Sequence, residues 1–459
     1  MQQYLPRSLR GPDPFDRESE VRTYCRRMPA VFDKAKNAEV WDENGRRYID
    51  FFSSCGALNY GHNNPQITKS LLSYIQGNGI TSSLDLHTVA KRQLISEFEQ
   101  TILGPRRLNY KLQFPGPTGT NAVEAAIKLA RKVTGRQTVV AFSNGFHGMT
   151  LGALALTENS TARRAAGVPL AHCHRLPFEG YQGASAQEFE LFERLVADTS
   201  IGHEGPAAFI VETVQGEGGL NVASNGWLHA LARTAARLGA LLIVDDIQAG
   251  CGRTGEFFSF ERAHLQPDII CLSKSIGGNG LPLSLVLMKP ELDVWTPGEH
   301  TGTFRGNNLA FVTATAALEF WRDPQFTMEI AQKALLVKKW LKETVHEYPN
   351  LAAARGCGLF QGIAFFDPDH AKGVTAAAYE NGILIEACGP HGEVVKIMPA
   401  LTIEPIILLE GLEQLKKSID RVLGAKCKES ICSVKPRVNS TSSLPQLISN
   451  SSNLVSYEY

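Results

Sequence analysis

The sequence predicts an α/β protein that has a large domain with a mainly parallel sheet and a smaller α+β domain. Short apolar runs recur between residues 138 and 288, and helical stretches such as 225–239 separate them. Runs that are apolar on both faces are typical of strands buried in a parallel sheet with helices on both sides. After about residue 309 the pattern changes to a long helical region followed by strands, which is typical of an α+β unit. The strands predicted for the large domain are 138–142, 208–214, 241–247, 268–273 and 283–288.

The other elements lie on either side of this region. Residues 40–52 predict a hairpin, because an Asn-Gly pair joins two short strands. Residues 309–347 are helical, and a helix over 404–424 follows the strands of the small domain. Those strands are predicted around 359–366, 382–387 and 394–403.

These elements divide the chain into four parts. The last part is rich in serine and asparagine without a helical period, so we expect it to be disordered. The predicted parts are an N-terminal segment that contributes to the small domain (1–70), the large domain (71–310), the C-terminal small domain (311–425) and the tail (426–459).

Composition limits the kind of partner. The chain has 459 residues, 46 basic and 46 acidic, so no net charge draws it to nucleic acid or to an anionic membrane. We therefore expect a small-molecule partner. The polar start of the chain has neither a signal peptide nor an anchor, and nine cysteines at irregular spacing are typical of reduced thiols. We expect a cytoplasmic protein.

The first candidate site is a helix start within 115–135, "PGPTGTNAVEAAIKLARKVTG". Free amide groups around Gly119, Thr120 and Asn121 can hold a phosphate group. An ordinary N-cap by Thr118 or Thr120 is the alternative. The P-loop ending Gly-Lys-Ser/Thr is absent from this stretch.

The second candidate is the pair of carboxylates in "IVDDIQAGCGRTG", residues 243–255. Because strand side chains alternate, Asp245 and Ile247 are predicted on one face and Asp246 on the other. A carboxylate at a buried strand end needs a cationic or protonated partner, and a protonated ring N–H suits Asp245. For Asp246 we prefer a structural role, in which it caps the following loop or pairs with Arg253.

The third and fourth candidates also follow strands. Lys274 comes just after the strand 268–273, and glycines at 277, 278 and 280 follow it. A lysine at such a place can form a Schiff base with an aldehyde, and the glycines are predicted to let the backbone come close to a ligand. Phe146, in "FHGMT", is either a core residue or a stacking surface for a planar cofactor.

The chain order of these candidates matches the needs of a pyridoxal 5'-phosphate site: a phosphate anchor, a ring stack, a partner for the pyridine nitrogen and an amine. The sequence resembles the class III aminotransferases, which are fold-type I pyridoxal-phosphate enzymes, from about residue 20 to 424. The motifs that carry the resemblance are "DDIQAGCGRTG" (245–255), "SKS" (273–275) and "GTFRGNN" (302–308).

The resemblance implies a role for each matched residue. Lys274 and Asp245 would be catalytic: Lys274 as the covalent anchor and proton carrier, and Asp245 as the partner that keeps the pyridine nitrogen protonated. Thr303 of a neighbouring subunit would complete the phosphate site, which implies at least a homodimer. The cofactor-binding residues would be Gly119, Thr120, Asn121, Phe146, His147, Asp245, Ile247, Gln248, Lys274 and Thr303, and the substrate residues Glu212, Glu217 and Lys396. No metal is expected, because "HCH" (172–174) lacks a full ligand set.

One branch of the family matches more closely. Many members have an arginine for the substrate carboxylate where this chain has Lys396, which offers a point charge and no bidentate fork. This departure, and the stretches 57–65, 113–136, 244–261 and 291–314, are similar to the L-2,4-diaminobutyrate aminotransferases of the ectoine-pathway type. The resemblance implies transfer of an amino group from L-glutamate to L-aspartate 4-semialdehyde. Two alternatives stay open: another ω-aminotransferase acting on ornithine, 4-aminobutyrate or a polyamine, and a pyridoxal-phosphate-binding protein without turnover.

Overall fold

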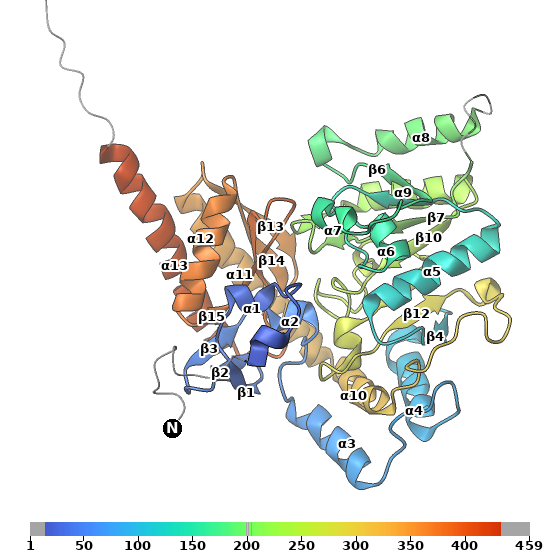
Figure 1. Ribbon diagram of the computed structural model, residues 1–459, viewed down its shortest axis with the longest axis horizontal. Helices are drawn as coiled ribbons and strands as arrows, with labels where there is room; N and C mark the ends of the chain where they lie inside the picture. Colours follow the sequence, from blue (N-terminus) through green and yellow to red (C-terminus); the bar gives the residue numbers. More distant parts are fainter. Residues whose placement is uncertain (1–13, 199, 201, 203, 433–459) are drawn as a thin grey trace, which may run out of the picture.

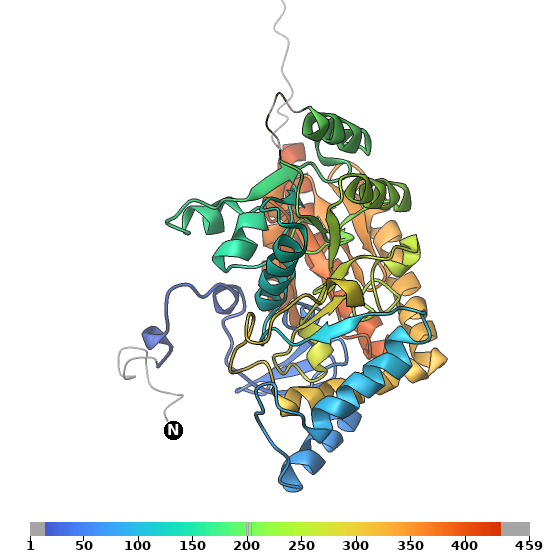
Figure 2. The same cartoon turned by 90° about the vertical axis from the view of Figure 1, so that its right-hand side faces the viewer.

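The computed structural model describes residues 14–432 except 199, 201 and 203. Two bodies lie side by side in Figure 1: the N-terminal strands and the C-terminal elements form one, and the middle of the chain forms the other. Figure 2 shows the molecule from the side of the large body, with the smaller one behind it. The predicted α/β class is confirmed.

The large body is built on a seven-stranded sheet with the order β4-β12-β11-β10-β7-β5-β6. The pairs from β11 to β6 are all parallel, whereas β12 runs antiparallel to both of its neighbours. The sheet is therefore mainly parallel, as predicted. Its strands are β4 (Lys111–Gln113), β5 (Val139–Phe142), β6 (Cys173–Leu176), β7 (Ala208–Val211), β10 (Leu241–Asp245), β11 (Ile269–Leu272) and β12 (Leu285–Met288).

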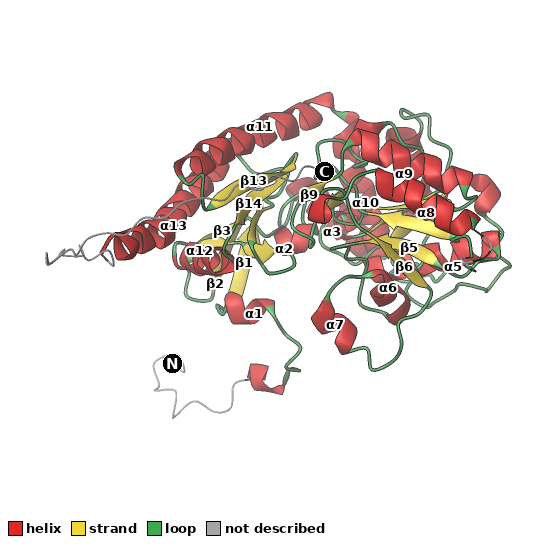
Figure 3. Ribbon diagram, turned by 90° about the horizontal axis from the view of Figure 1, so that it is seen from above, coloured by secondary structure: helices red, strands yellow, loops and turns green. Residues whose placement is uncertain are grey.

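Helices cover both faces of this sheet, as Figure 3 shows. Alternate residues of each strand point to opposite faces, so Ile243 packs with the apolar stripe of α5 (Gly119–Thr134), and Val244 lies in the other core, with α9 (Asn225–Arg237) and α10 (Asn308–Leu318). This two-sided burial is why the strands are apolar at every position.

The register of the sheet determines where the site lies. Asp245 is the last residue of β10 and pairs with Cys271 of the parallel strand β11. Lys274 follows two residues after β11 ends. Because parallel strands end at the same edge, Asp245 and Lys274 leave the sheet side by side, at the edge where α/β sheets bind ligands.

The smaller body combines both ends of the described chain. Its two four-stranded sheets have the orders β1-β2-β3-β15 and β13-β14-β17-β16. In the first sheet, Ile49 of the N-terminal hairpin pairs in parallel with Ile383. The strands are β1 (Phe32–Lys36), β2 (Glu39–Asp42), β3 (Arg47–Asp50), β13 (Ala352–Cys357), β14 (Phe360–Phe365), β15 (Ile383–Leu384), β16 (Glu386–Cys388) and β17 (Val394–Ile397), with α11 (Pro324–Glu347), α12 (Pro368–Glu380) and α13 (Pro405–Cys432) packed against them.

Several boundaries differ from the prediction. The strands β7 and β10 end earlier than predicted, at Val211 and Asp245, and two helices differ as well. The helical region 309–347 is split, because Asp323 caps a new helix through the amide of Gln325 and Pro324 occupies its first position. The last helix continues to Cys432, beyond the expected start of the tail at 426, and residues 433–459 lie outside the described part of the chain.

Shorter elements complete the chain. They are α1 (Tyr24–Arg27), α2 (Ser53–Gly56), α3 (Pro65–Gln76), α4 (Val89–Phe98), α6 (Leu151–Leu156), α7 (Ser160–Arg164), α8 (Gln187–Ala197), β8 (Val214–Gln215) and β9 (Asn221–Val222). None of the helices in the described ranges is long and apolar enough to span a bilayer.

Candidate active site

Asp245 and His147 form a buried pair at the edge of the large sheet. Asp245 Oδ2 lies 2.8 Å from His147 Nδ1, and both residues are 3% exposed. Burial alone would lower the pKa of His147, but the hydrogen bond and negative charge of Asp245 raise it. The backbone amide of Ile247 donates to the other carboxylate oxygen at 3.2 Å. Asp245 is therefore held in one orientation by its own chain.

The loop that carries Phe146 and His147 is fixed by Glu212. Its carboxylate accepts hydrogen bonds from the amides of Phe146 (3.0 Å) and Gly216 (3.3 Å). Burial raises the pKa of Glu212 to about 7. Glu212 thus ties two loops of the sheet edge together, and its predicted contact with substrate stays a prediction.

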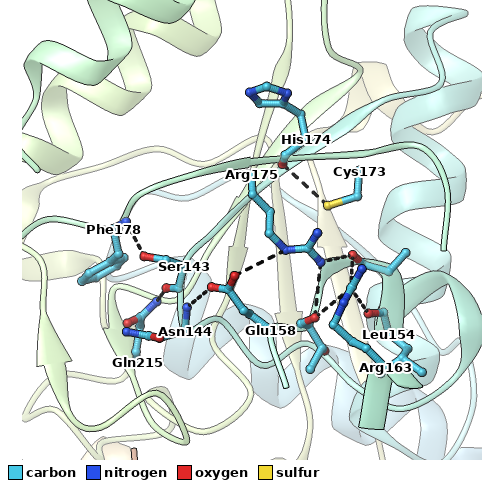
Figure 4. A network of polar contacts seen from close by, with 12 residues as sticks. Ser143, Asn144, Leu154, Glu158, Arg163, Cys173, His174, Arg175, Phe178 and Gln215 are labelled. Atoms are coloured by element: carbon cyan, nitrogen blue, oxygen red, sulfur yellow. Dashed lines mark hydrogen bonds and ion pairs between the residues drawn. The ribbon is translucent and has the colours of Figure 1, made fainter. Parts of the chain in front are cut away.

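A second network holds the other side of this loop (Figure 4). Glu158 accepts a hydrogen bond of 2.6 Å from the amide of Asn144 and lies 4.0 Å from the guanidinium of Arg175. Arg163 and Arg175 donate to backbone carbonyls at the end of α6, including that of Ala155, at 3.0 and 2.6 Å. The turn between β5 and α6, which presents Phe146 and His147, is therefore braced from both sides.

The start of α5 has the properties of an anion site. The amide and hydroxyl of Thr118 both donate to Asn121 Oδ1, at 3.2 and 2.8 Å, so the side chain of Asn121 is used in the helix cap. Within the described ranges, the amides of Gly119 and Thr120 have no hydrogen-bond partner. Ile247 packs so closely on Gly119 that an added Cβ would lie 3.0 Å from its side chain. The predicted phosphate anchor thus lies directly beside the predicted ring contact.

Lys274 is held in a strained conformation. Its φ is +52°, in the left-handed region that costs a non-glycine residue about 1 kcal/mol. The neighbouring hydroxyls fix it there: Ser273 donates to the carbonyl of Leu283 at 2.8 Å, and Ser275 donates to the carbonyl of Gly56. Among the described residues, the Lys274 ammonium takes part in no hydrogen bond or ion pair, which leaves it available for a ligand.

Two of the glycines after Lys274 lie against close neighbours within the protein. An added Cβ on Gly278 would lie 2.4 Å from the carbonyl of Thr313, and one on Gly280 would lie 3.1 Å from Leu58. Thr313 also donates to the carbonyl of Gly277 at 2.7 Å. Gly278 therefore allows α10 to pack against the backbone, and Gly280 faces Leu58. That the glycines also let the backbone come close to a ligand stays a prediction.

Opposite Lys274, two carboxylates surround a buried cation. The ammonium of Lys396 lies 2.8 Å from Glu217 and 2.9 Å from Glu386, and the Lys396 side chain is fully buried. Burial opposes its charge, but the two carboxylates keep the pKa of Lys396 well above its ordinary value. Burial likewise opposes the charge of Glu217, and Lys396 and Lys274 lower its pKa to about 2. Gln248 also donates to Glu217, at 3.3 Å.

The turn formed by α2 brings a further residue to this cluster. Ser53, Ser54 and Cys55 have successive φ values of 45°, 50° and 56°, all left-handed. Gln248 donates to the carbonyl of Cys55 at 3.0 Å, which fixes the turn against the large body. The Cys55 thiol then lies 3.1 Å from the hydroxyl of Tyr24 and 3.8 Å from Glu386 Oε2.

Sequence reasoning missed Tyr24, Cys55 and Glu386. No pattern in the sequence signals three successive left-handed residues at non-glycine positions. Glu386 could have been found by the argument used for Asp245, because it is an acidic residue in an otherwise apolar strand segment, 382–387.

Asp246 has the structural role that we preferred. It accepts a hydrogen bond of 3.0 Å from the amide of Ser259, and burial raises its pKa to about 7. Its predicted alternative partner, Arg253, instead donates to the carbonyls of Leu359 (3.1 Å) and Pro399 (2.5 Å) in the smaller body. Arg253 therefore joins the two bodies beneath the site.

The structure thus brings most predicted site residues to one edge of the large sheet. Thr303 differs: it is exposed on the loop before α10, and no hydrogen bond in the described chain links it to the others. Within the described residues, no group of three or more His, Cys, Asp or Glu side chains is arranged to hold a metal ion.

Comparison with known proteins identifies the family. The model of the class-III aminotransferases matches residues 22–419, so the chain belongs to this family and is an aminotransferase. It is 56% identical to a diaminobutyrate–2-oxoglutarate transaminase of Nocardia farcinica, over 88% of this chain and 93% of the relative. It is 51% identical to the enzyme of the same name from Halalkalibacterium halodurans, over 89% and 96% of the two chains. A solved ornithine aminotransferase of Toxoplasma gondii, with PLP partially occupying its active site, superposes with a TM-score of 0.78 at 28% identity, over 90% of this chain and 94% of that one.

The family assignment confirms pyridoxal 5'-phosphate as the cofactor, and the residues present fit it. The free amides at the start of α5 suit its phosphate group. Asp245 offers a buried carboxylate for the pyridine nitrogen, with its position fixed by His147. The unpaired ammonium of Lys274 suits its aldehyde.

Proposed function

We propose that the protein transfers the amino group of L-glutamate to L-aspartate 4-semialdehyde, giving 2-oxoglutarate and L-2,4-diaminobutyrate. The observation that carries this proposal is the cluster of Glu217, Glu386 and Lys396 facing Lys274, because it offers both acidic and basic groups to a substrate with charges at two ends. The names of relatives that are 51% and 56% identical support the same reaction.

Pyridoxal 5'-phosphate supplies an aldehyde that takes up the amino group and an electron-withdrawing ring that stabilises negative charge on the substrate carbon. Asp245 keeps the ring nitrogen protonated, and His147 keeps Asp245 in place. Lys274 acts as the base that removes and returns the proton at the reacting carbon. Phe146 and Ile247 confine the ring, and Gln248 orients the neighbouring Glu217.

Glu217 allows one site to accept two substrates. A carboxylate of glutamate can reach the fully buried Lys396 only if Glu217 leaves it. The side chain of Glu217 is 31% exposed, so it has room to move. When glutamate is bound, Lys396 therefore pairs with the substrate carboxylate. When the diamino acid is bound, Lys396 keeps its ion pair with Glu217.

The site is proposed to be completed in a homodimer. Thr303 lies next to Phe304, which is 70% exposed, and the amide of Ser83 hydrogen-bonds to the carbonyl of Gly306 in the same loop. Around the start of α4, the apolar residues Ile80, Leu86 and Val89 are also more than half exposed. A partner subunit that covers this surface would receive Thr303 at its own phosphate site.

We also propose that the enzyme works in the cytoplasm and supplies diaminobutyrate for ectoine. Thiols such as those of Cys251 and Cys271 are buried and unpaired, which suits a reducing compartment. The similarity of the motifs to the ectoine-pathway branch supports the pathway.

An amino-acceptor panel tests the proposed function. Purified enzyme with glutamate as donor is given L-aspartate 4-semialdehyde, glutamate 5-semialdehyde or succinate semialdehyde, and formation of 2-oxoglutarate is followed. We expect the first acceptor to give the highest kcat/KM. A preference for either of the others would favour an ornithine or 4-aminobutyrate aminotransferase instead.

A further inference from the structure

The cluster opposite Lys274 carries an unbalanced negative charge. Lys396 supplies one positive charge, whereas Glu217 and Glu386 are both carboxylates within 2.9 Å of it. Lys274 lies near enough for its positive charge to lower the pKa of both carboxylates. When Lys274 is engaged with a ligand, a second cation would restore the balance.

Glu386 is the member of the cluster with unused binding capacity. It is 3% exposed, and its Oε1 lies 2.9 Å from the Lys396 ammonium, so this oxygen is already paired. Its other oxygen has only the weak Cys55 thiol, at 3.8 Å. Glu217, by contrast, already accepts hydrogen bonds from Lys396 and Gln248. A buried carboxylate oxygen whose one donor is a thiol is poorly satisfied, so Oε2 can accept a stronger donor from a ligand.

The proposed substrate has such a donor. When the γ-amino group of 2,4-diaminobutyrate is the reacting group and lies next to Lys274, the α-ammonium group remains free at the far end of a short chain. 4-Aminobutyrate has the same reacting end and carboxylate but lacks this ammonium group. Glutamate reacts through its only amino group, so it also brings no second ammonium.

We propose that Glu386 binds the α-ammonium group of L-2,4-diaminobutyrate, and of L-aspartate 4-semialdehyde, and thereby selects α-amino acids with a reacting γ-position over simple ω-amino acids. This inference rests on the proposed function. Burial raises the pKa of Glu386 despite the neighbouring Lys396, and a bound ammonium favours the ionised form again. The Cys55 thiol contacts both Glu386 Oε2, at 3.8 Å, and the Tyr24 hydroxyl, at 3.1 Å.

The test compares two ligands that differ by the ammonium group alone. Dissociation constants for 2,4-diaminobutyrate and 4-aminobutyrate are measured by calorimetry with cofactor-loaded Lys274→Ala and Lys274→Ala/Glu386→Gln, so that no turnover occurs. We expect Glu386→Gln to raise the dissociation constant of diaminobutyrate by about 10- to 100-fold, as is typical when a charged hydrogen-bond partner is lost. The dissociation constant of 4-aminobutyrate should change by less than about threefold. The matched control is Glu393→Gln, because among the described residues the Glu393 carboxylate accepts a hydrogen bond only from the amide of His391; this variant should change the binding of neither ligand.

Further measurements separate selectivity from folding. In the Lys274-intact enzyme, Glu386→Gln should keep its cofactor content, measured by absorbance, which shows that the variant is folded. If that variant fails to fold, Glu386→Asp is used instead, because it keeps the negative charge on a side chain shorter by one methylene. The preference for diaminobutyrate over 4-aminobutyrate should then be smaller than in the parent but not lost. An unchanged ligand preference in the Gln or the Asp variant overturns the inference. Failure of the parent enzyme to transaminate diaminobutyrate at all would instead refute the proposed function.

Discussion

Replacing Lys396 by methionine tests the cluster as a structural unit. Methionine keeps the length of the side chain but leaves Glu217 and Glu386 buried without their cation. The pKa of Glu217 falls from 4.5 to about 2 in the folded protein. A difference of this size corresponds to about 3 kcal/mol of stability at neutral pH. Breaking a buried ion pair by removing one partner costs about 3–5 kcal/mol, so we expect Lys396→Met to destabilise the enzyme by this amount at pH 7.

The pH dependence follows from the same pKa. Because the pKa of Glu217 is lowered, its contribution is fully present above pH 4.5 and is lost as the pH falls towards 2. The assay is urea unfolding followed by circular dichroism, at pH 7 and at the lowest pH at which the parent remains folded. The triple variant Lys396→Met/Glu217→Gln/Glu386→Gln removes both uncompensated charges and should recover most of the loss. A Lys396→Met enzyme as stable as the parent at pH 7, or a triple variant that recovers nothing, would refute the reasoning.

Three further predictions concern the chemistry. Lys274→Ala should lose covalent attachment of the cofactor, measured by borohydride trapping and mass spectrometry, together with turnover; full activity would contradict the role of Lys274. Asp245→Asn should retain bound cofactor but slow the half-reaction with glutamate at least about 100-fold, because the ring nitrogen is no longer held protonated; stopped-flow absorbance at the parent rate would contradict this. Glu217→Gln should lower KM for glutamate, because Lys396 loses an internal partner that competes with the substrate carboxylate. It should raise KM for diaminobutyrate, because the cluster loses one negative charge. If both KM values move in the same direction, Lys396 does not exchange Glu217 for the carboxylate of glutamate.

Features that depend on local pattern could be predicted from the sequence. The apolar strands of the large sheet and the carboxylate that ends β10 follow from composition at neighbouring positions, so Asp245 and Lys274 were placed at the same edge. Ile247 does lie near Asp245, as predicted, but for a different reason. The strand ends at Asp245, so the alternation of strand side chains does not apply to Ile247.

Features that depend on distant contacts could not be predicted. The short edge strands β4 and β6 are polar and become strands only by pairing with β12 and β5. Gly278, four residues after Lys274, faces α10, which lies 30 or more residues further along the chain. Glu386 and Cys55 reach the site from opposite ends of the sequence, through the smaller body, and no local pattern connects them.

The central claim is most directly tested by following the nitrogen atom itself. The purified enzyme is incubated with L-[¹⁵N]glutamate and unlabelled L-aspartate 4-semialdehyde, and the diaminobutyrate formed is analysed by NMR. The account predicts ¹⁵N on the C4 amino group of the product, one label for each 2-oxoglutarate released, with the C2 nitrogen unlabelled. Label at C2, or no labelled diaminobutyrate while the enzyme transfers nitrogen to another acceptor, would contradict it.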